Sequence, residues 1–335
     1  MKTLLKVLAG LVALALLAVA GGVAFLGARK PAQRPPPDEK VAATPERLAR
    51  GEYLVKNVTG CLHCHGDMQF EYFGMPPRPG SEGGGGFTFT RENAGVPGTV
   101  TARNLTADPE TGKGNWTDGE LMRAIREGID KDGEALFPMM PYKFLRHIGD
   151  EDLRAVIAYI RTLKPIKKTV PPRKIDFPVS LFIKLEPQPL TGPVHTPDDA
   201  KDHLGYGRYL SLVSGCFECH TAVDDRMKFV PGQDYAGGRK FAPGGLHVVS
   251  ANLTPHPDNY MGQAAREQFI GRFRAFAGPE GRTQKVPRSR NTVMPWYAFA
   301  GMTDQDLGAI YDYLKTLKPI AKKVDPFPTP AVAAR

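Results

Sequence analysis

The longest hydrophobic stretch of the chain lies at its N-terminus. It runs from Val7 to Ala28 without a charged residue. Basic residues flank it on both sides (Lys2, Lys6, Arg29 and Lys30). About 20 apolar residues cross a bilayer as a helix, so residues 1–28 are predicted to form a transmembrane anchor. A cleaved signal segment is the alternative, because Ala18-Val19-Ala20 fits a cleavage site, but the continuation to Ala28 favours the anchor.

Two later segments have the apolar spacing of an amphipathic helix. In the first, apolar residues recur every three or four positions (Leu153, Val156, Ile157, Ile160 and Leu163), and in the second the same spacing returns (Leu307, Ile310, Tyr311, Leu314 and Leu317). Pro165 and Pro319 mark where these helices end, and Thr303 with Asp306 resembles a capping box. The alternation of a sheet domain is missing, so the fold is predicted to be mainly α.

These helices belong to a tandem repeat. The segment Thr162-Leu163-Lys164-Pro165-Ile166 returns as Thr316-Leu317-Lys318-Pro319-Ile320. Two shorter motifs also return: Asn104-Leu105-Thr106 as Asn252-Leu253-Thr254, and Met140-Pro141-Tyr142 as Met294-Pro295-Trp296. Repeats of this length indicate two copies of one structural unit. The sequence therefore predicts one domain over residues 44–168 and a second over residues 196–324.

The segments outside the repeats are rich in proline. Residues 29–43 are predicted to form an extended spacer that holds the domains off the membrane, and residues 169–195 an extended linker between the domains. Residues 325–335 are left as a C-terminal tail. Thr44 and Thr196, each followed by proline, are predicted to cap the first helix of each domain.

All four cysteines fall in one kind of motif. Cys61-Leu62-His63-Cys64-His65 and Cys216-Phe217-Glu218-Cys219-His220 both read C-x-x-C-H, the attachment site of a c-type haem. Two thiols one helical turn apart can form thioethers to the two vinyl groups on one porphyrin edge, and the following histidine then ligates the iron. A redox dithiol, a disulfide pair or a zinc site does not need this histidine twice. The sequence therefore predicts two covalently bound haem c groups.

The net charge of the chain and its expected export reduce the number of function classes that remain. The formal net charge is +9, but beyond Lys40 the chain has 38 basic and 33 acidic residues, and no basic run with interleaved aromatics stands out. Nucleic-acid binding is therefore not expected. Because c-type haem is joined to protein outside the bacterial cytoplasm, the motifs agree with an exported chain. We expect it at the bacterial inner membrane facing the periplasm, or in the periplasm if residues 1–28 are cleaved.

The second axial ligand of each iron separates an electron carrier from an enzyme. Met140 and Met294 lie 75 and 74 residues beyond His65 and His220, and each precedes proline and an aromatic residue. Histidine with methionine gives a closed, relatively high-potential haem. The other methionines and histidines have no matched counterpart in the other repeat. Met140 and Met294 are therefore the predicted sixth ligands.

The repeated motifs resemble those of class I c-type cytochromes, and more narrowly the diheme and triheme cytochrome c subunits of membrane-bound alcohol and gluconate dehydrogenases. The resemblance rests on the Asn-Leu-Thr motifs, the segments around Met140 and Met294, and residues 111–117. It covers both repeats and implies two tandem class I cytochrome c domains, each with a haem held by histidine and methionine. The chain has two haem motifs where these dehydrogenase subunits often have three.

The expected function is electron transfer between a dehydrogenase or quinol-oxidising partner and a downstream acceptor, with no organic substrate. A diheme peroxidase or thiosulfate-oxidising enzyme is one alternative, and it would need an open iron. A non-catalytic subunit of a larger dehydrogenase complex is the other. Trp116, Arg126 and Arg274 are candidate contacts for haem propionates, because an indole N–H or a guanidinium pairs with carboxylate. For all three, a purely structural role is the competing interpretation.

Overall fold

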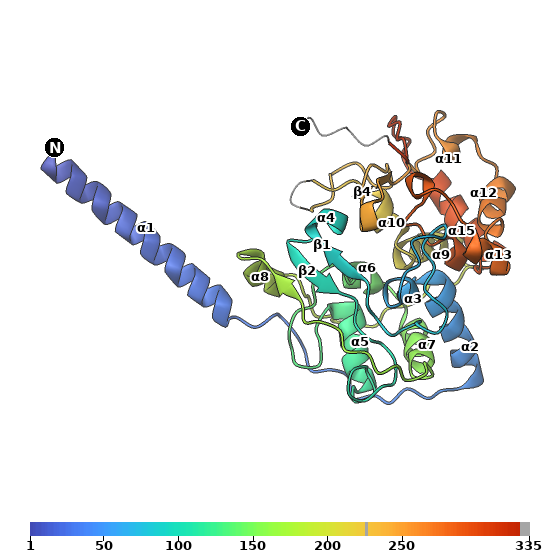
Figure 1. Ribbon diagram of the computed structural model, residues 1–335, viewed down its shortest axis with the longest axis horizontal. Coiled ribbons are helices and arrows are strands. Elements are labelled where there is room, and N and C mark those ends of the chain that lie inside the picture. Colours follow the sequence, from blue (N-terminus) through green and yellow to red (C-terminus); the bar gives the residue numbers. More distant parts are fainter. Residues whose placement is uncertain (225–226, 329–335) are drawn as a thin grey trace.

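A single helix at the N-terminus, α1 (Lys2–Ala28), projects away from the rest of the chain (Figure 1). The computed structural model of the protein describes residues 1–224 and 227–328. No residue of α1 is buried, and in the described residues it is the one helix long and apolar enough to cross a membrane. The predicted apolar helix is therefore confirmed, while its length and composition suit a signal segment as well as an anchor.

Short helices connected by long loops make up the rest of the molecule. The first half contains α2 (Pro45–Tyr53), a π-helical turn (Leu54–Val58), α3 (Cys61–Cys64), α4 (Arg91–Ala94), α5 (Asp118–Glu127), α6 (Tyr142–Leu145) and α7 (Asp150–Ile160). The second half contains α9 (His203–Val213), α10 (Cys216–His220), α11 (Tyr260–Gln263), α12 (Arg266–Arg274), α13 (Gly278–Thr283), α14 (Trp296–Phe299) and α15 (Asp304–Lys315). The mainly helical character agrees with the prediction.

In each half, the first helix packs across the closing helix. Helix α2 packs on α7, and α9 packs on α15. A Cβ atom at Gly51 would lie 2.0 Å from the carbonyl oxygen of Ala155, and one at Gly207 would lie 2.0 Å from that of Ala309. Glycine is thus required at both crossings, because any side chain there would force the backbones apart. The two predicted amphipathic helices supply the other face of each crossing.

The predicted caps at Thr44 and Thr303 are confirmed, whereas the one predicted at Thr196 is wrong. Thr44 caps α2 by accepting from the Arg47 N–H, and Thr303 caps α15. Thr196 does not start a helix: it donates its hydroxyl to Asp152, 3.1 Å away. Helix α9 begins seven residues later at His203, where Asp202 accepts from the Gly205 N–H. Asp202 precedes the apolar run directly, and its carboxylate is the better cap.

Short strands are present where none was predicted. Strands β1 (Thr88–Thr90) and β2 (Gly98–Thr101) pair antiparallel, and β3 (Lys174–Ile175) adds to β2. Strands β4 (Lys240–Phe241) and β5 (Val248–Val249) form a second pair. These strands have two to four residues, which is too short for an alternating pattern to stand out in the sequence.

The proline-rich linker is also more structured than expected. Besides β3 it contains the short helix α8 (Val179–Phe182) and a 3₁₀ turn (Ile183–Leu185). The prediction of a purely extended linker is therefore wrong for residues 174–185. Proline sits at the N-terminal side of α8, where it is compatible with a helix start.

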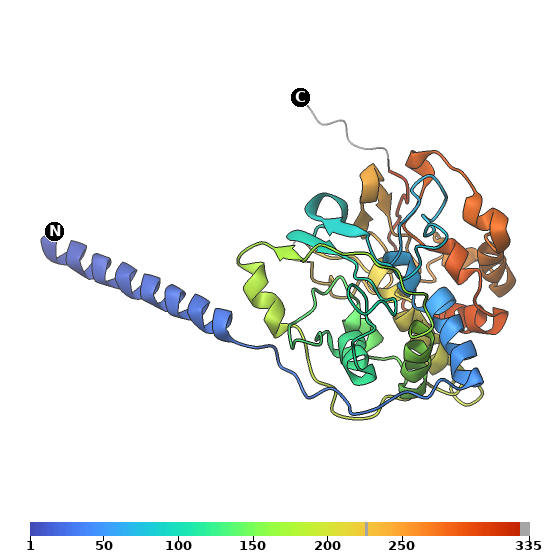
Figure 2. The same cartoon turned by 60° about the horizontal axis from the view of Figure 1, so that its bottom comes forward.

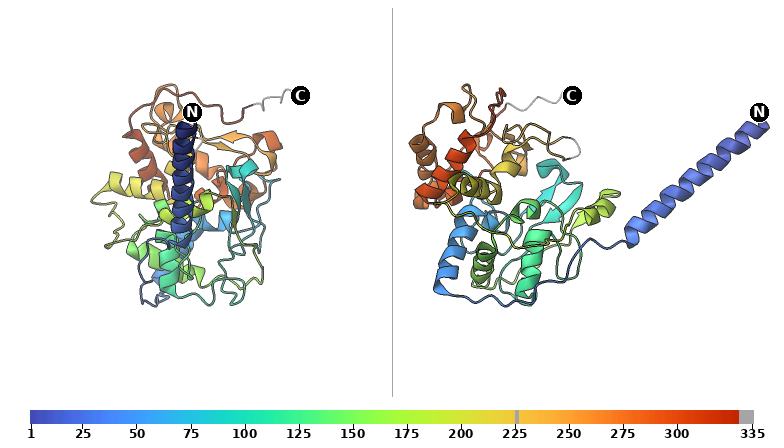
Figure 3. Two further views of the ribbon diagram at one scale, coloured as in Figure 1. Left: turned by 90° about the vertical axis from the view of Figure 1, so that its left-hand side faces the viewer. Right: turned by 180° about the vertical axis from the view of Figure 1, so that it is seen from behind.

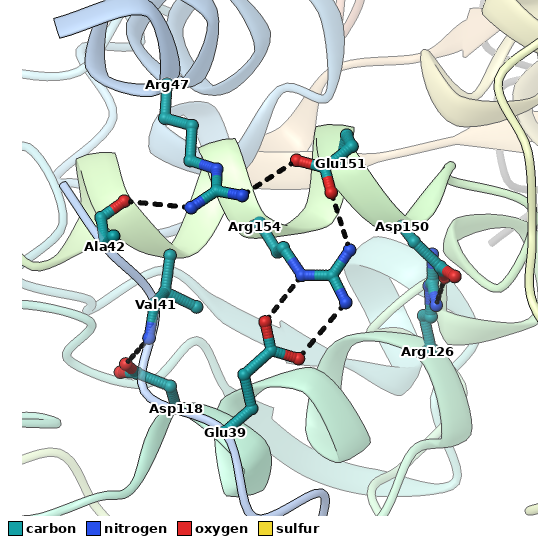
Figure 4. A network of polar contacts seen from close by, with 9 residues as sticks. All are labelled: Glu39, Val41, Ala42, Arg47, Asp118, Arg126, Asp150, Glu151 and Arg154. Atoms are coloured by element: carbon teal, nitrogen blue, oxygen red, sulfur yellow. Dashed lines mark hydrogen bonds and ion pairs between the residues drawn. The ribbon is translucent and has the colours of Figure 1, made fainter. Parts of the chain in front are cut away.

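The predicted spacer of residues 29–43 lies against the protein surface instead of standing free (Figure 2). We call this segment the strap. Pro31 is buried, and Glu39 accepts from Arg154 at 2.5 and 3.2 Å. The Val41 N–H donates to Asp118 at 2.8 Å (Figure 4). The segment is thus held by polar contacts with α5 and α7, whereas its four prolines suggested a spacer that stands free of the domains.

The buried side chains of the two halves form one connected cluster. Leu54 and Ile157 from the first half and Leu210 and Ile310 from the second all belong to it. Figures 1 and 3 show α2 and α7 on one side and α9 and α15 on the other. Of the predicted tail, residues 329–335 lie outside the described part of the chain.

Reciprocal hydrogen bonds join the two halves. The Tyr53 hydroxyl donates to Asp306 at 2.5 Å, and the Tyr209 hydroxyl donates to Asp152 at 2.6 Å. Both pairs join the first helix of one half to the closing helix of the other, and the partners exchange roles across the repeat. This exchange is the arrangement of an interface with approximate twofold symmetry.

Candidate functional site

Each C-x-x-C-H motif lies on one turn of helix that follows a left-handed glycine. Gly60, with φ 63°, precedes α3, and Gly215, with φ 78°, precedes α10. The Thr59 hydroxyl is 3.1 Å from Cys61 Sγ, and the Ser214 hydroxyl is 3.2 Å from Cys216 Sγ. Positive φ favours glycine at these turns, which position both cysteine pairs in the same way.

The histidine of each motif is oriented by a backbone carbonyl. His65 Nδ1 lies 2.6 Å from the Arg103 oxygen, and His220 Nδ1 lies 2.7 Å from the Ala251 oxygen. A carbonyl only accepts, so Nδ1 carries the proton and donates, which leaves the Nε2 lone pair free to bind a metal. Burial lowers the pKa of His65 to about 4 and lowers that of His220, which favours the neutral ring.

The repeated Asn-Leu-Thr motif holds those carbonyls in place. Asn104 accepts from the Thr106 N–H and hydroxyl at 3.0 and 2.7 Å and donates to the Ile166 carbonyl at 2.7 Å. Asn252 makes the equivalent bonds to Thr254 and Ile320, at 2.9, 2.8 and 3.0 Å. Each motif therefore ties the loop that contacts the histidine to the segment after the closing helix. The sequence revealed the repeat but not this role.

A glycine supports each histidine from its backbone side. The Gly85 N–H donates to the His65 carbonyl at 3.0 Å, and the Gly237 N–H donates to the His220 carbonyl at 2.7 Å. A Cβ at Gly85 would lie 2.5 Å from the Ala102 oxygen, and one at Gly237 would lie 2.4 Å from the Ser250 oxygen. Both glycines have positive φ, so both positions exclude larger residues. Sequence reasoning did not single out these two glycines as site residues.

The second site contains a cavity with mainly apolar walls. A cavity of about 110 Å³ lies between Cys216, His220 and Met294. Aromatic and aliphatic side chains form most of the wall (Phe269, Phe273, Trp296, Phe299, Leu307 and Leu314). The predicted attachment cysteine, iron-ligating histidine and methionine of this repeat thus face one space. The donor set and the apolar walls fit a haem.

Two further methionines line the same cavity. Met261 and Met302 are almost completely buried and contribute to its wall together with Met294. Neither has a methionine at the matching position of the first repeat, so Met294 stays the predicted ligand. Sequence reasoning set both aside because neither has a counterpart in the other repeat. Their burial against the site depends on the folding of α11 and of the turn before α15.

The first site repeats the local structure around its methionine. Pro141 and Pro295 have similar backbone angles, with φ −79° and −80°, and each starts a short helix, α6 or α14. The Tyr142 N–H donates to the Met140 carbonyl at 2.8 Å, and the Trp296 N–H donates to the Met294 carbonyl at 2.9 Å. Met140 is half-buried. Its role as an iron ligand stays a prediction.

The two arginines predicted to contact haem propionates, Arg126 and Arg274, form hydrogen bonds within the protein. Arg126 donates to Asp150 at 2.6 Å and to the Ile148 carbonyl. Arg274 donates to Asp304 at 2.9 Å and to the Met302 carbonyl at 2.5 Å, which is the same arrangement one repeat later. These bonds fix the start of each closing helix. Contacts of either arginine with a propionate stay a prediction.

Trp116 lies partly buried against the core of the first half. The Lys113 ammonium stands over its ring, 3.9 Å from the ring centre. Its backbone carbonyl accepts from Arg161 at 2.5 Å, joining the loop before α5 to the end of α7. A contact between its indole N–H and a haem propionate also stays a prediction.

The two attachment motifs face each other across the interface between the halves. His63 Nδ1 lies 3.0 Å from the Tyr297 hydroxyl. Burial and then the nearby Cys219 thiol raise the pKa of Cys64 to about 12. Burial also raises the pKa of Glu218, opposed by Arg239, whose Nη1 is 3.6 Å from the carboxylate. His63, the third residue of the first motif, and the second cysteine of each motif therefore lie near this interface.

Comparison with known proteins identifies the class: the homologues of this chain are c-type cytochromes. No family model matches the chain. The cytochrome c subunit of a quinone-dependent alcohol dehydrogenase from Gluconobacter oxydans is 28% identical over 81% of the chain and 54% of its own length. The corresponding subunit from Gluconacetobacter polyoxogenes is 31% identical over 67% of the chain and 49% of its own length.

A third relative has nearly the same extent as this chain. It is a diheme c-type cytochrome from Cereibacter sphaeroides, 27% identical over 92% of the chain and 97% of its own length. The chain spans about half the length of the alcohol dehydrogenase subunits that it matches. Homology and the two C-x-x-C-H motifs together support covalently bound haem c as the cofactor.

Proposed function

We propose that the protein is a membrane-tethered, periplasm-facing diheme cytochrome c built from two tandem class I domains. It relays electrons between a dehydrogenase or quinol-oxidising partner and a downstream acceptor. The observation that carries the proposal is the repeated site: two C-x-x-C-H motifs whose histidines are oriented by the same carbonyl contact. Relatives named as cytochrome subunits of alcohol dehydrogenases support a dehydrogenase as the partner.

In this proposal, Cys61 and Cys64 hold one haem and Cys216 and Cys219 the other. His65 and Met140 ligate the first iron, and His220 and Met294 the second. When bound, haem c supplies a one-electron redox centre, while the protein sets its potential through ligands, burial and hydrogen bonds. The Nδ1–H bonds to Arg103 and Ala251 hold each imidazole in one tautomer and increase the basicity of Nε2.

The arrangement of the two sites supports a direct relay. Motif residues of both halves meet at the interface, where His63 contacts Tyr297 and Cys64 lies near Cys219. Haems attached to these cysteines would be held near the same interface, where they would supply two one-electron centres within one protein. The reciprocal Tyr53–Asp306 and Tyr209–Asp152 bonds keep this geometry fixed.

Haem counting tests the proposal. The full chain, produced in bacteria with c-type haem maturation, should carry two covalent haems by intact mass and by denatured haem absorbance. The Cys61→Ser/Cys64→Ser and Cys216→Ser/Cys219→Ser variants should each keep one. A protein with no covalent haem, or with its full haem content after either replacement, would contradict the assignment of the motifs.

A further inference from the structure

Large hydrophobic side chains gather on the surface in the middle of the linker. Beyond residue 28, the described residues expose six of them (Phe177, Phe182, Leu185, Leu204, Met227 and Tyr260). Three of the six, Phe177, Phe182 and Leu185, lie within nine residues around α8. Their exposed fractions are 67%, 50% and 43%. Such clustering on an otherwise polar surface marks an interaction site.

The 3₁₀ turn that follows α8 attaches this segment to the protein. Ile183 is buried, with 6% of its surface exposed, while its neighbour Phe182 points outward. Strand β3, just before α8, pairs with β2. The Lys143 ammonium pairs with Glu186, just after the 3₁₀ turn. Because both ends are anchored, the exposed side chains are presented by an ordered element.

The exposed patch lies beside the end of α1. Lys184 donates to the carbonyl of Gly27 at 2.7 Å, and α1 contacts α8. Leu26 is the one residue of α1 that is partly covered. Figure 1 shows α8 at the point where α1 meets the body, and the reverse view in Figure 3 agrees.

The length of α1 sets the depth of this contact in a bilayer. The uncharged stretch from Val7 to Ala28 would extend about 33 Å as a helix, at 1.5 Å per residue. The hydrocarbon core is about 30 Å thick. Gly27 would therefore lie where the hydrocarbon ends and the headgroups begin, and its partner Lys184 would lie at the same level.

The strap restricts how far the body can move from that level. Only Arg29 and Lys30 separate the end of α1 from the buried Pro31. The strap is then held by Arg34, which pairs with the buried Glu127 at 2.8 Å, and by the Glu39–Arg154 pair (Figure 4). A flexible tether would let the body rotate away from the bilayer, whereas this one keeps α8 next to it.

We infer that Phe177, Phe182 and Leu185 form a second membrane contact that inserts into the headgroup–acyl boundary beside α1. Phenylalanine and leucine suit this boundary, and lysines and arginines nearby (Arg29, Lys30 and Lys184) match anionic headgroups. The contact would orient the two haem sites relative to the bilayer. The inference rests on the membrane anchor in the proposed function.

Site-specific photocrosslinking in lipid tests this inference. The full chain is placed in nanodiscs of phosphatidylethanolamine and phosphatidylglycerol, with p-benzoylphenylalanine at position 182, 177, 25 or 204 in separate samples. Phe25 in α1 reports insertion of the anchor. Leu204 is exposed to 46%, similar to Phe182, and lies in α9 away from α8, so it is the matched control. After illumination, lipid adducts are counted by mass spectrometry.

We expect lipid adducts at positions 25, 177 and 182, with at least tenfold fewer at position 204. Adducts at position 25 without adducts at 177 and 182 would overturn the second contact while leaving the anchor intact. An absence of adducts at position 25 would contradict the anchor itself, and with it the inference. Equal yields at 182 and 204 would show non-specific lipid contact and would also overturn the inference.

Discussion

At the scale of single residues, a backbone carbonyl determines the state of each candidate ligand. Arg103 and Ala251 accept from Nδ1 of His65 and His220, so both rings present Nε2 to the space beside the cysteines. The methionines are less constrained. Three of them face the second cavity, and only the repeat distinguishes Met294 from Met261 and Met302.

Replacing these methionines separately tests that distinction. Met294→Ala should open the second iron, so that one haem of two binds carbon monoxide and its potential falls, because a methionine ligand raises the potential. Met302→Leu conserves the side-chain volume. It should lower the free energy of unfolding by less than about 1.5 kcal/mol and should leave both irons closed. Optical titration with and without carbon monoxide measures both. Carbon monoxide binding in Met302→Leu but not in Met294→Ala would reverse the assignment.

The cysteines and histidines of the attachment motifs could be predicted from the sequence, but the groups that hold them in place could not. The spacing of cysteine and histidine is a local pattern that can be recognised without any knowledge of the fold. The carbonyls that orient the histidines lie 38 and 31 residues away and belong to the backbone, which has no sequence signature. The burial of Met302 in the cavity wall likewise depends on tertiary packing.

At the scale of secondary-structure elements, the two helix crossings depend on glycine. Gly51→Ala and Gly207→Ala would each place a Cβ 2.0 Å from a carbonyl oxygen. Each should lower the free energy of unfolding by about 1–3 kcal/mol or more, as overpacking does. Gly271→Ala in α12 is the control, because its Cβ meets no atom within 4 Å. This replacement should raise the free energy of unfolding by about 0.5–1 kcal/mol.

Chemical denaturation of the three haem-loaded variants measures these differences. Equal stability of Gly51→Ala and the wild-type protein would mean that α2 and α7 do not cross as closely as described.

The start of α9 should make stability depend on pH. His203 faces Asp199 at 2.6 Å through Nδ1 and Asp312 at 2.9 Å through Nε2, while Arg266 shares Asp312 at 3.3 Å. Only the protonated ring can donate to both carboxylates, and these two hydrogen bonds, Asp312 first, raise the pKa of His203. Its stabilising effect is thus fully present below the unfolded pKa of about 6.5 and is lost as the pH rises through the folded value.

His203→Gln should remove this dependence. The difference in melting temperature between the wild-type protein and the variant should be largest below about pH 6.5 and should shrink as the pH rises above it. Thermal denaturation from pH 5.5 to pH 9 provides the measurement. A difference that grows with pH would have the wrong sign for this account.

The closing helices α7 and α15 could be predicted from the spacing of their apolar residues, because each buries one apolar face. The starts of α9 and α8 were not, since Thr196 bonds to Asp152 and the linker helix has only four residues.

At the scale of the whole molecule, the packing of the two halves brings the two attachment motifs near each other. Tyr53→Phe and Tyr209→Phe each remove a hydrogen bond to a carboxylate, and each should destabilise by about 1.5–3 kcal/mol. Tyr260→Phe, whose exposed hydroxyl donates to the Gln268 carbonyl, should change stability by less than about 0.5 kcal/mol. Calorimetry of the three variants measures the effects. Equal, small effects in all three would contradict a tight interface.

No sequence pattern could predict these reciprocal contacts, because Tyr53 and Asp306 are 253 residues apart. The repeat predicted that the halves are alike, not how they pack. Similarly, the prolines of the strap predicted an extended chain correctly but gave no sign that it lies against α5 and α7.

The central claim is that the protein carries two closed haems that pass electrons and bind no substrate. An optical redox titration of the full chain, repeated under carbon monoxide, tests it most directly. The account predicts that both haems titrate at positive potentials and that neither binds carbon monoxide. A haem that binds carbon monoxide readily, or titrates far below the other, would contradict it and would favour a peroxidase or thiosulfate-oxidising enzyme with one open iron.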